Sequence, residues 1–128
     1  RCCGLQLQML DGTLLAWVKT EAIHERSAQA AKSVEICRPS GETFATLSKD
    51  EGLPCYRYIL RNRAWQRLYT YQGDYRHKAV SVTNTASHLI CTSERCRMEF
   101  DTAPHYQVRV APRTDAGLVL CGLLAIDK

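Results

Sequence analysis

The segment from residue 57 to residue 78 holds the side chains whose types and spacing most clearly suggest chemistry. It contains six basic residues against a single acid, Asp74, and its net charge is +5 in a chain whose total is +4. Guanidinium groups bind phosphate oxygens in pairs, and clustered bases gain about 1 kcal/mol each near an anionic membrane surface. The segment predicts a site for phospholipid headgroups, with a solvated basic face as the alternative. The residues of this site are Arg57, Arg61, Arg63, Arg67, Arg76 and Lys78.

Aromatic residues alternate with these bases, at Tyr56, Tyr58, Trp65, Tyr69, Tyr71 and Tyr75. Single-stranded nucleic acid binds to the same combination, because its bases stack on aromatic rings. No RNA-recognition motif accompanies them, and strand alternation directs about half of the rings inward, so nucleic acid ranks second. Alternation also places Arg67 on the face opposite to Trp65 or Leu68. The guanidinium groups are then expected to point outward while these apolar partners pack inside.

Other chemistry receives little support from the sequence. Side chains that suit zinc occur at His88, Cys91, Cys96 and His105, but no tight second pair of ligands appears among them. No nucleophile motif, phosphate-binding loop or dinucleotide fingerprint is present. The sequence therefore predicts a protein that is not an enzyme and that uses no metal or other cofactor.

Antiparallel strands separated by turn residues are expected to position the basic segment. Asp11-Gly12 predicts a two-residue turn of type I′ between Leu5–Leu10 and Thr13–Val18, and Pro39-Ser-Gly41 predicts a second turn. That second turn joins Val34–Arg38 to Glu42–Ser48, and the stretch Glu21–Lys32 is a connection of either helical or loop form. Arg61-Asn-Arg63 is a further predicted turn. The remaining predicted strands are Cys55–Leu60, Ala64–Tyr71, Lys78–Thr83, His88–Thr92, Cys96–Phe100 and Tyr106–Val110.

The uncharged run from Ala116 to Ile126 predicts one helix, which begins at an N-cap of Thr114 or Asp115. A helix that is apolar on all faces must be buried, and this one is too short for a lipid span of roughly 20 residues. The residues expected to form its core contacts are Leu118, Leu120, Leu123, Leu124 and Ile126. A barrel wide enough to enclose a helix is favoured over a sandwich. The predicted fold is all-β with one buried helix, in a single domain of residues 1–128. Its antiparallel barrel is either closed or incomplete, in which case it is open on one side or lacks N-terminal strands.

The seven cysteines are odd in number and irregularly spaced, which argues against a disulfide framework. Cys2 and Cys3 are adjacent near the terminus and are candidate lipidation sites, with two free thiols as the alternative. No apolar run reaches transmembrane length, and no signal-peptide pattern is present. These features favour a cytoplasmic location, and a headgroup site would add peripheral association with the plasma membrane.

The end of the chain also follows a recognisable order of elements. An alternating strand at Tyr106–Val110 precedes a short acidic turn, Thr114-Asp115, and an aliphatic run that ends in Asp127. Earlier, Ile36–Leu47 forms a hairpin in which a glycine turn precedes a strand of small and aliphatic residues. In this pattern the chain resembles the tubby C-terminal-like superfamily, which includes tubby proteins, phospholipid scramblases and LURP-one-related proteins.

The resemblance implies an antiparallel barrel around a hydrophobic C-terminal helix, with more strands than are predicted here. The LURP-one-related proteins are the closer match within the superfamily. The resemblance thus implies a small, non-enzymatic intracellular module that associates with phosphoinositide or other anionic phospholipid. A phospholipid scramblase-like protein is the alternative within the superfamily.

Overall fold

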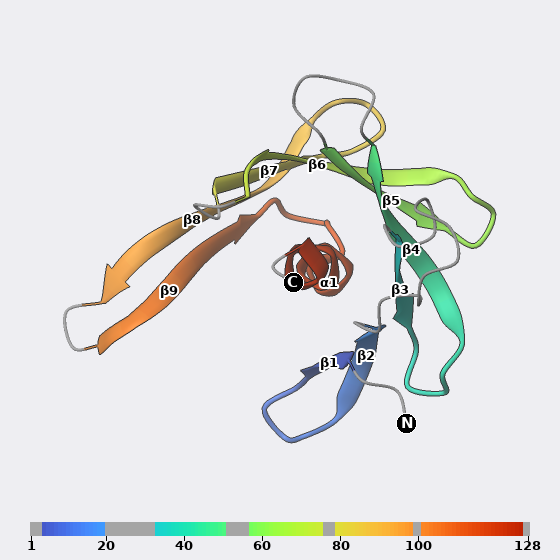
Figure 1. The fold of residues 1–128 in the computed structure, drawn as a ribbon, viewed down its shortest axis with the longest axis horizontal. Coiled ribbons are helices and arrows are strands. Elements are labelled where there is room, and N and C mark those ends of the chain that lie inside the picture. The colour runs from blue at the N-terminus through green and yellow to red at the C-terminus, as the bar shows by residue number, and fades with distance from the viewer. Residues whose placement is uncertain (1–3, 20–32, 51–56, 76–78, 99–100, 127–128) are drawn as a thin grey trace.

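A computed structural model of the chain describes residues 4–19, 33–50, 57–75, 79–98 and 101–126. Antiparallel strands make up most of these residues, and one helix follows them at the C-terminal end (Figure 1). The all-β class with a single C-terminal helix is therefore confirmed. The elements are β1 (Gly4–Gln8), β2 (Leu14–Lys19), β3 (Ser33–Cys37), β4 (Thr43–Asp50), β5 (Arg57–Asn62), β6 (Arg67–Asp74), β7 (Ala79–Thr83), β8 (Leu89–Met98), β9 (Asp101–Val110) and α1 (Ala116–Ile126).

The described strands form one sheet whose spatial order is the same as their order along the chain. Each strand pairs with its chain neighbours, and β1 and β9 are the two edges. The sheet curves around α1, which is seen end-on within the curve in Figure 1. Among the described residues the sheet does not close, because β1 and β9 do not pair with each other. One side of the helix therefore faces the opening between these edges.

Four hairpin turns share one backbone geometry, in which the first residue exchanges hydrogen bonds with the residues three and four places later. These turns begin at Met9, Arg38, Asn62 and Asn84. The fourth residue of each is left-handed: φ is 90° at Gly12, 92° at Gly41, 64° at Trp65 and 62° at Ser87. The type I′ turn predicted at Asp11-Gly12 is therefore wrong, because the loop is a three-residue one with its left-handed position last. This backbone suits glycine, whereas it costs a residue with a Cβ atom about 1–2 kcal/mol.

Two strand boundaries differ from those expected. The turn between β5 and β6 runs from Asn62 to Gln66, so Arg61 lies in β5 and Trp65 lies in the turn. The strand expected at Cys96–Phe100 is not separate, because β8 continues to Met98 and β9 already begins at Asp101. A long two-stranded ribbon of β8 and β9 therefore replaces the three shorter strands expected between His88 and Val110. The predicted connection Glu21–Lys32 lies outside the described residues.

The core lies between the concave face of the sheet and α1. Its buried side chains alternate along the strands, as in Ala45 and Leu47 of β4 and Val80 and Val82 of β7. In α1 the buried positions are Val119, Cys121, Gly122 and Ala125. The five large residues predicted as the helix core, Leu118, Leu120, Leu123, Leu124 and Ile126, are all half-buried. The open sheet explains this difference, because it covers the helix fully on one side only.

The N-terminus of α1 is capped as the sequence predicts. The Asp115 carboxylate accepts a hydrogen bond from the backbone N–H of Leu118 at 3.0 Å, and its carbonyl accepts one from Val119 at 3.1 Å. A carboxylate at this place satisfies a backbone donor that has no partner inside the helix. Within the described residues, no helix is both long enough and apolar enough to cross a lipid bilayer.

Candidate anion-binding site

The pairing of β4, β5 and β6 determines which side chains of the basic segment point outward. Leu60 of β5 pairs with Leu47 and with Tyr69, and these side chains belong to the core beneath α1. Because side chains alternate along a strand, Arg57, Ile59 and Arg61 lie on the opposite, convex face. Ile59 is only 1% exposed there, although it is not part of the core cluster around the helix. The two arginines therefore flank a buried apolar residue on the outer face of the sheet.

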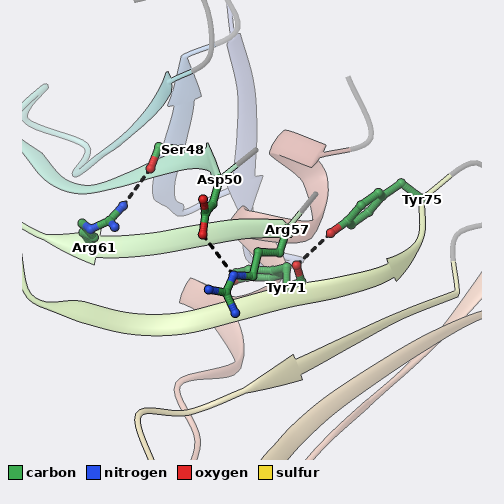
Figure 2. Close-up of polar contacts among 6 residues, drawn as sticks. All are labelled: Ser48, Asp50, Arg57, Arg61, Tyr71 and Tyr75. Atoms are coloured by element: carbon green, nitrogen blue, oxygen red, sulfur yellow. Dashed lines mark hydrogen bonds and ion pairs between the residues drawn. The ribbon is translucent and has the colours of Figure 1, made fainter. Parts of the chain in front are cut away.

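Two arginines of the site have acidic partners. The Nε atom of Arg57 donates to Asp50 Oδ2 at 3.1 Å (Figure 2), and both side chains are partly buried. Arg63 forms an ion pair with Glu42, which lies in the neighbouring turn between β3 and β4. Exposed ion pairs of this kind contribute little to stability, because water and salt screen them. The sequence alone does not reveal Asp50 or Glu42 as partners, because only the folded sheet brings them to these arginines.

Arg61 and Arg67 differ from the other two arginines. They are register partners across β5 and β6, so two positive side chains face each other in adjacent strands. Arg61 Nη1 donates to the neutral Ser48 Oγ at 2.8 Å (Figure 2), and Arg67 is exposed. Among the described residues, neither arginine forms an ion pair with a carboxylate. Like charges placed opposite one another are unfavourable. An anion bound beside both guanidinium groups would remove this repulsion.

Trp65 lies next to this pair, at the tip of the β5–β6 hairpin. Its side chain was expected to pack inside, but it is 62% exposed. The Arg61 guanidinium lies over the indole, 5.5 Å from the ring centroid, within the range of a cation–π contact. Asn62 explains why the strand ends before Trp65, because its Oδ1 accepts the Gln66 N–H at 2.9 Å. An Asn at the first turn position was the sequence feature that indicated this turn.

The tyrosines of the basic segment lie mainly on the inner face. Tyr58 and Tyr69 pack against the core, and Tyr71 is fully buried within it. The Tyr71 hydroxyl donates to the Val119 carbonyl of α1 at 3.1 Å, and Tyr75 donates to the Tyr71 carbonyl at 2.8 Å. Burial raises the pKa of Tyr71 well above its usual value, with the nearby thiols of Cys91 and Cys121 as lesser causes. These rings therefore join the sheet to the helix.

An apolar pocket of about 120 Å³ lies where the helix faces β7, β8 and β9. Its walls are Tyr75, Val80, Ser93, Tyr106, Val108, Leu120, Leu123, Leu124 and Ile126. Four of these nine residues are the half-buried side chains of α1 that were predicted to be core. The pocket is distinct from the arginine pair, because it lies against the helix, on the concave face.

Several predicted residues lie outside the described part of the chain. They are Arg76 and Lys78 of the basic segment, Tyr56, and the candidate lipidation sites Cys2 and Cys3. Of the side chains considered for zinc, Cys96 and His105 are register partners on β8 and β9, whereas Cys91 is buried and His88 is exposed in a turn. The described residues contain no group of three or more His, Cys, Asp or Glu side chains placed so that they could hold a metal ion.

Comparisons with protein-family models, with curated proteins and with solved structures find no match to this chain. The resemblance to the tubby C-terminal-like superfamily accordingly stays a prediction from the sequence.

Proposed function

We propose that this protein is a non-enzymatic, tubby-like module of the LURP-one-related kind that binds anionic phospholipid, phosphoinositides included, at a membrane surface. The observation behind this proposal is the Arg61–Arg67 pair on the convex face. These two guanidinium groups face each other without a described carboxylate partner. A phosphate or phosphodiester group offers the paired oxygens that guanidinium groups bind best. Arg57 and Arg63 contribute less charge to the site, because Asp50 and Glu42 already pair with them.

The position of the aromatic rings supports lipid over single-stranded nucleic acid. A stacking platform needs several exposed rings beside the bases. Tyr58, Tyr69 and Tyr71 instead pack toward the helix, and Trp65 is the exposed ring among the described aromatic residues of the basic segment. One exposed indole can stack with one base, which is a small part of such a platform.

The first prediction compares two variants that each lose two positive charges. Arg61→Gln with Arg67→Gln removes the proposed phosphate ligands, whereas Arg95→Gln with Arg109→Gln removes two exposed arginines of β8 and β9. Co-sedimentation should be measured with vesicles of phosphatidylcholine alone, with added phosphatidylserine, and with added phosphoinositide. At about 1 kcal/mol for each base, the first variant should bind the anionic vesicles about 30-fold more weakly than wild type. The second should bind nearly as well as wild type.

A salt series and thermal unfolding complete this test. Binding should weaken as salt rises, because the attraction is between charges near a surface. Both variants should unfold cooperatively near the wild-type temperature. Arg67, Arg95 and Arg109 are exposed, and Arg61 loses only one hydrogen bond to a hydroxyl and its contact with the exposed Trp65. Equal losses in the two variants would mean that net charge, and not the Arg61–Arg67 pair, attracts the membrane. Equal binding to neutral and anionic vesicles would refute the proposed function.

A further inference from the structure

The turn that holds Trp65 is one of four turns with the same backbone, and the residue at its left-handed position is unusual. Two of the other turns place glycine there, Gly12 and Gly41, and the third places the small residue Ser87. A bulky aromatic residue is rare at a left-handed position. Trp65 also remains 62% exposed, so little burial offsets the backbone cost. The fold itself therefore does not explain a tryptophan at this position.

The turn that presents Trp65 is held in place by its own side chains. Asn62 and Gln66 exchange two hydrogen bonds, Gln66 N to Asn62 Oδ1 and Asn62 Nδ2 to Gln66 Oε1, each of 2.9 Å. The backbone adds the Trp65 N–H bond to the Asn62 carbonyl at 3.0 Å. Because the turn is already ordered, the indole can leave water for an apolar environment without the entropic cost of ordering the loop.

Other exposed apolar residues lie at the same end of the sheet as Trp65. In an antiparallel meander, the turns that follow β1, β3, β5 and β7 all lie at one end of the strands. Large apolar side chains in or beside these turns include Met9, Leu10 and Leu89, which are 53%, 109% and 57% exposed. The same turns hold the exposed cations Arg38 and Arg63. We call this end of the sheet, formed by residues 9–13, 38–42, 62–66 and 84–88, the turn rim.

Resting on the function proposed above, we propose that the turn rim faces the membrane and that Trp65 is its anchor, with the indole inserted at the headgroup level of an anionic bilayer. Tryptophan concentrates at this depth, because its ring is largely apolar while its N–H still needs a polar partner. Arg61, which lies over the ring, and the neighbouring Arg67 would then meet the lipid phosphates at the same depth. Insertion and phosphate binding are therefore parts of one contact.

The Trp65→Gly variant tests this anchor without damaging the fold. Glycine suits the left-handed backbone, so the variant should unfold at a temperature no lower than wild type. Its affinity for vesicles of phosphatidylcholine and phosphatidylserine should fall roughly tenfold, as expected when about 60 Å² of indole surface no longer leaves water. Ser87→Gly is the matched control for the backbone, because it makes the same change in another turn of the rim but removes only a small polar side chain. It should lower affinity far less than Trp65→Gly does. Equal affinities of Trp65→Gly and wild type would overturn the anchor.

Fluorescence quenching measures the insertion directly, because this chain has two tryptophans, Trp17 and Trp65. In a Trp17→Phe variant, vesicles whose acyl chains are brominated should quench and blue-shift the remaining indole. In Trp65→Gly, the remaining Trp17 lies within β2 and should not be quenched. Binding to anionic vesicles without quenching of Trp65 would overturn the anchor and leave the proposed function standing, whereas no binding would overturn both. Stronger quenching by a single-stranded oligonucleotide than by vesicles would assign the indole to nucleic acid instead.

Discussion

The buried hydroxyl of Tyr71 shows how one residue links the sheet to the helix. It donates to the Val119 carbonyl of α1 at 3.1 Å, and Tyr71 is completely buried. A buried hydroxyl without a partner would cost more than the hydrogen bond gains, so the position of Val119 and that of Tyr71 depend on each other. Tyr71 belongs to β6, the strand that also holds Arg67, and its side chain packs on the opposite face of the sheet. The helix therefore supports the candidate site from the opposite face of the sheet.

Tyr71→Phe should lower the free energy of unfolding by about 1 kcal/mol, because it removes this hydrogen bond while the ring still fills its place in the core. Urea unfolding followed by circular dichroism measures the change. Tyr106→Phe is the control, because Tyr106 is 41% exposed and its hydroxyl should contribute little. If Tyr71→Phe were as stable as Tyr106→Phe, the hydrogen bond to Val119 would make no net contribution to the free energy of unfolding.

The helix α1 illustrates what the sequence predicts about an element and what it does not. Its bounds and its Asp115 cap follow from an uncharged run that begins after a capping residue. Its buried face does not follow from apolar character, because leucine and alanine are both apolar. Small residues take that face since Tyr71 approaches so closely that a Cβ atom at Gly122 would overlap with the Tyr71 hydroxyl. This approach arises from strand register, which the helix sequence does not contain.

The two glycines of α1 should therefore respond in opposite ways to alanine. A Cβ atom at Gly117 would make ordinary contacts, 3.5 Å from Asp115 Oδ1 and 3.7 Å from Leu7 Cδ2. Gly117→Ala should raise the free energy of unfolding by about 0.5–1 kcal/mol through helix propensity. Gly122→Ala should lower it despite the same propensity, because the Tyr71 ring must move. Chemical denaturation of both variants measures the difference, and a stabilised Gly122→Ala would contradict the close approach.

The turns show a second limit of prediction at the scale of elements. The turns at Asp11-Gly12 and Pro39-Ser-Gly41 were placed correctly because glycine identifies the left-handed position. The turn at Asn62–Gln66 has Trp65 at that position, so hydrophobic alternation assigned the residue to a strand. The first residue, Asn62, was the better indicator, as Asn84 also begins the turn between β7 and β8. Had Asn62 been given more weight than the apolar pattern, the sequence would have placed Trp65 in the turn.

At the scale of the whole molecule, the number of strands was easier to predict than their closure. Turn residues reveal where each strand ends, so the meander is readable from the sequence. Whether a sheet closes depends on strand tilt and on the stagger between neighbours, which are properties of the assembled sheet. The bulges beside the hairpin turns, such as that between Leu60 and Arg61, alter this stagger. For this reason the sequence left both a closed and an open barrel possible, and individual strands could not decide between them.

Buried thiols in the core should make the stability of the fold depend on pH in the alkaline range. Burial raises the pKa of Cys121 from 9.0 to about 11, helped by Asp115, and burial raises the pKa of Cys91 as well. Unfolded thiols lose their protons near their usual pKa of 9.0, whereas the folded chain keeps them protonated. The unfolded state therefore binds fewer protons, and stability should fall as pH rises from about 9 toward 11.

Cys121→Ala should show a smaller loss of thermal stability between pH 8 and pH 10.5 than wild type, because one of these thiols is gone. Differential scanning calorimetry at the two pH values measures the loss. Cys96→Ala is the control, since Cys96 is outside the buried core, and its loss should match that of wild type. If wild type, Cys121→Ala and Cys96→Ala all lost the same thermal stability between the two pH values, the loss would not come from Cys121.

The order of the sheet, in which every strand pairs with its chain neighbours, has a kinetic consequence. Most of these strands are joined by short loops, which close quickly. The nine described strands can therefore assemble largely one after another, without waiting for distant segments to meet. The helix is the exception, because it brings Val119 to Tyr71, 48 positions away, and Gly117 to Leu7 of the first strand. Docking of α1 is therefore the step that must close the longest loops. We expect docking of α1 to limit the refolding rate. The unfolding rate should respond most to substitutions that weaken the contacts between α1 and the sheet.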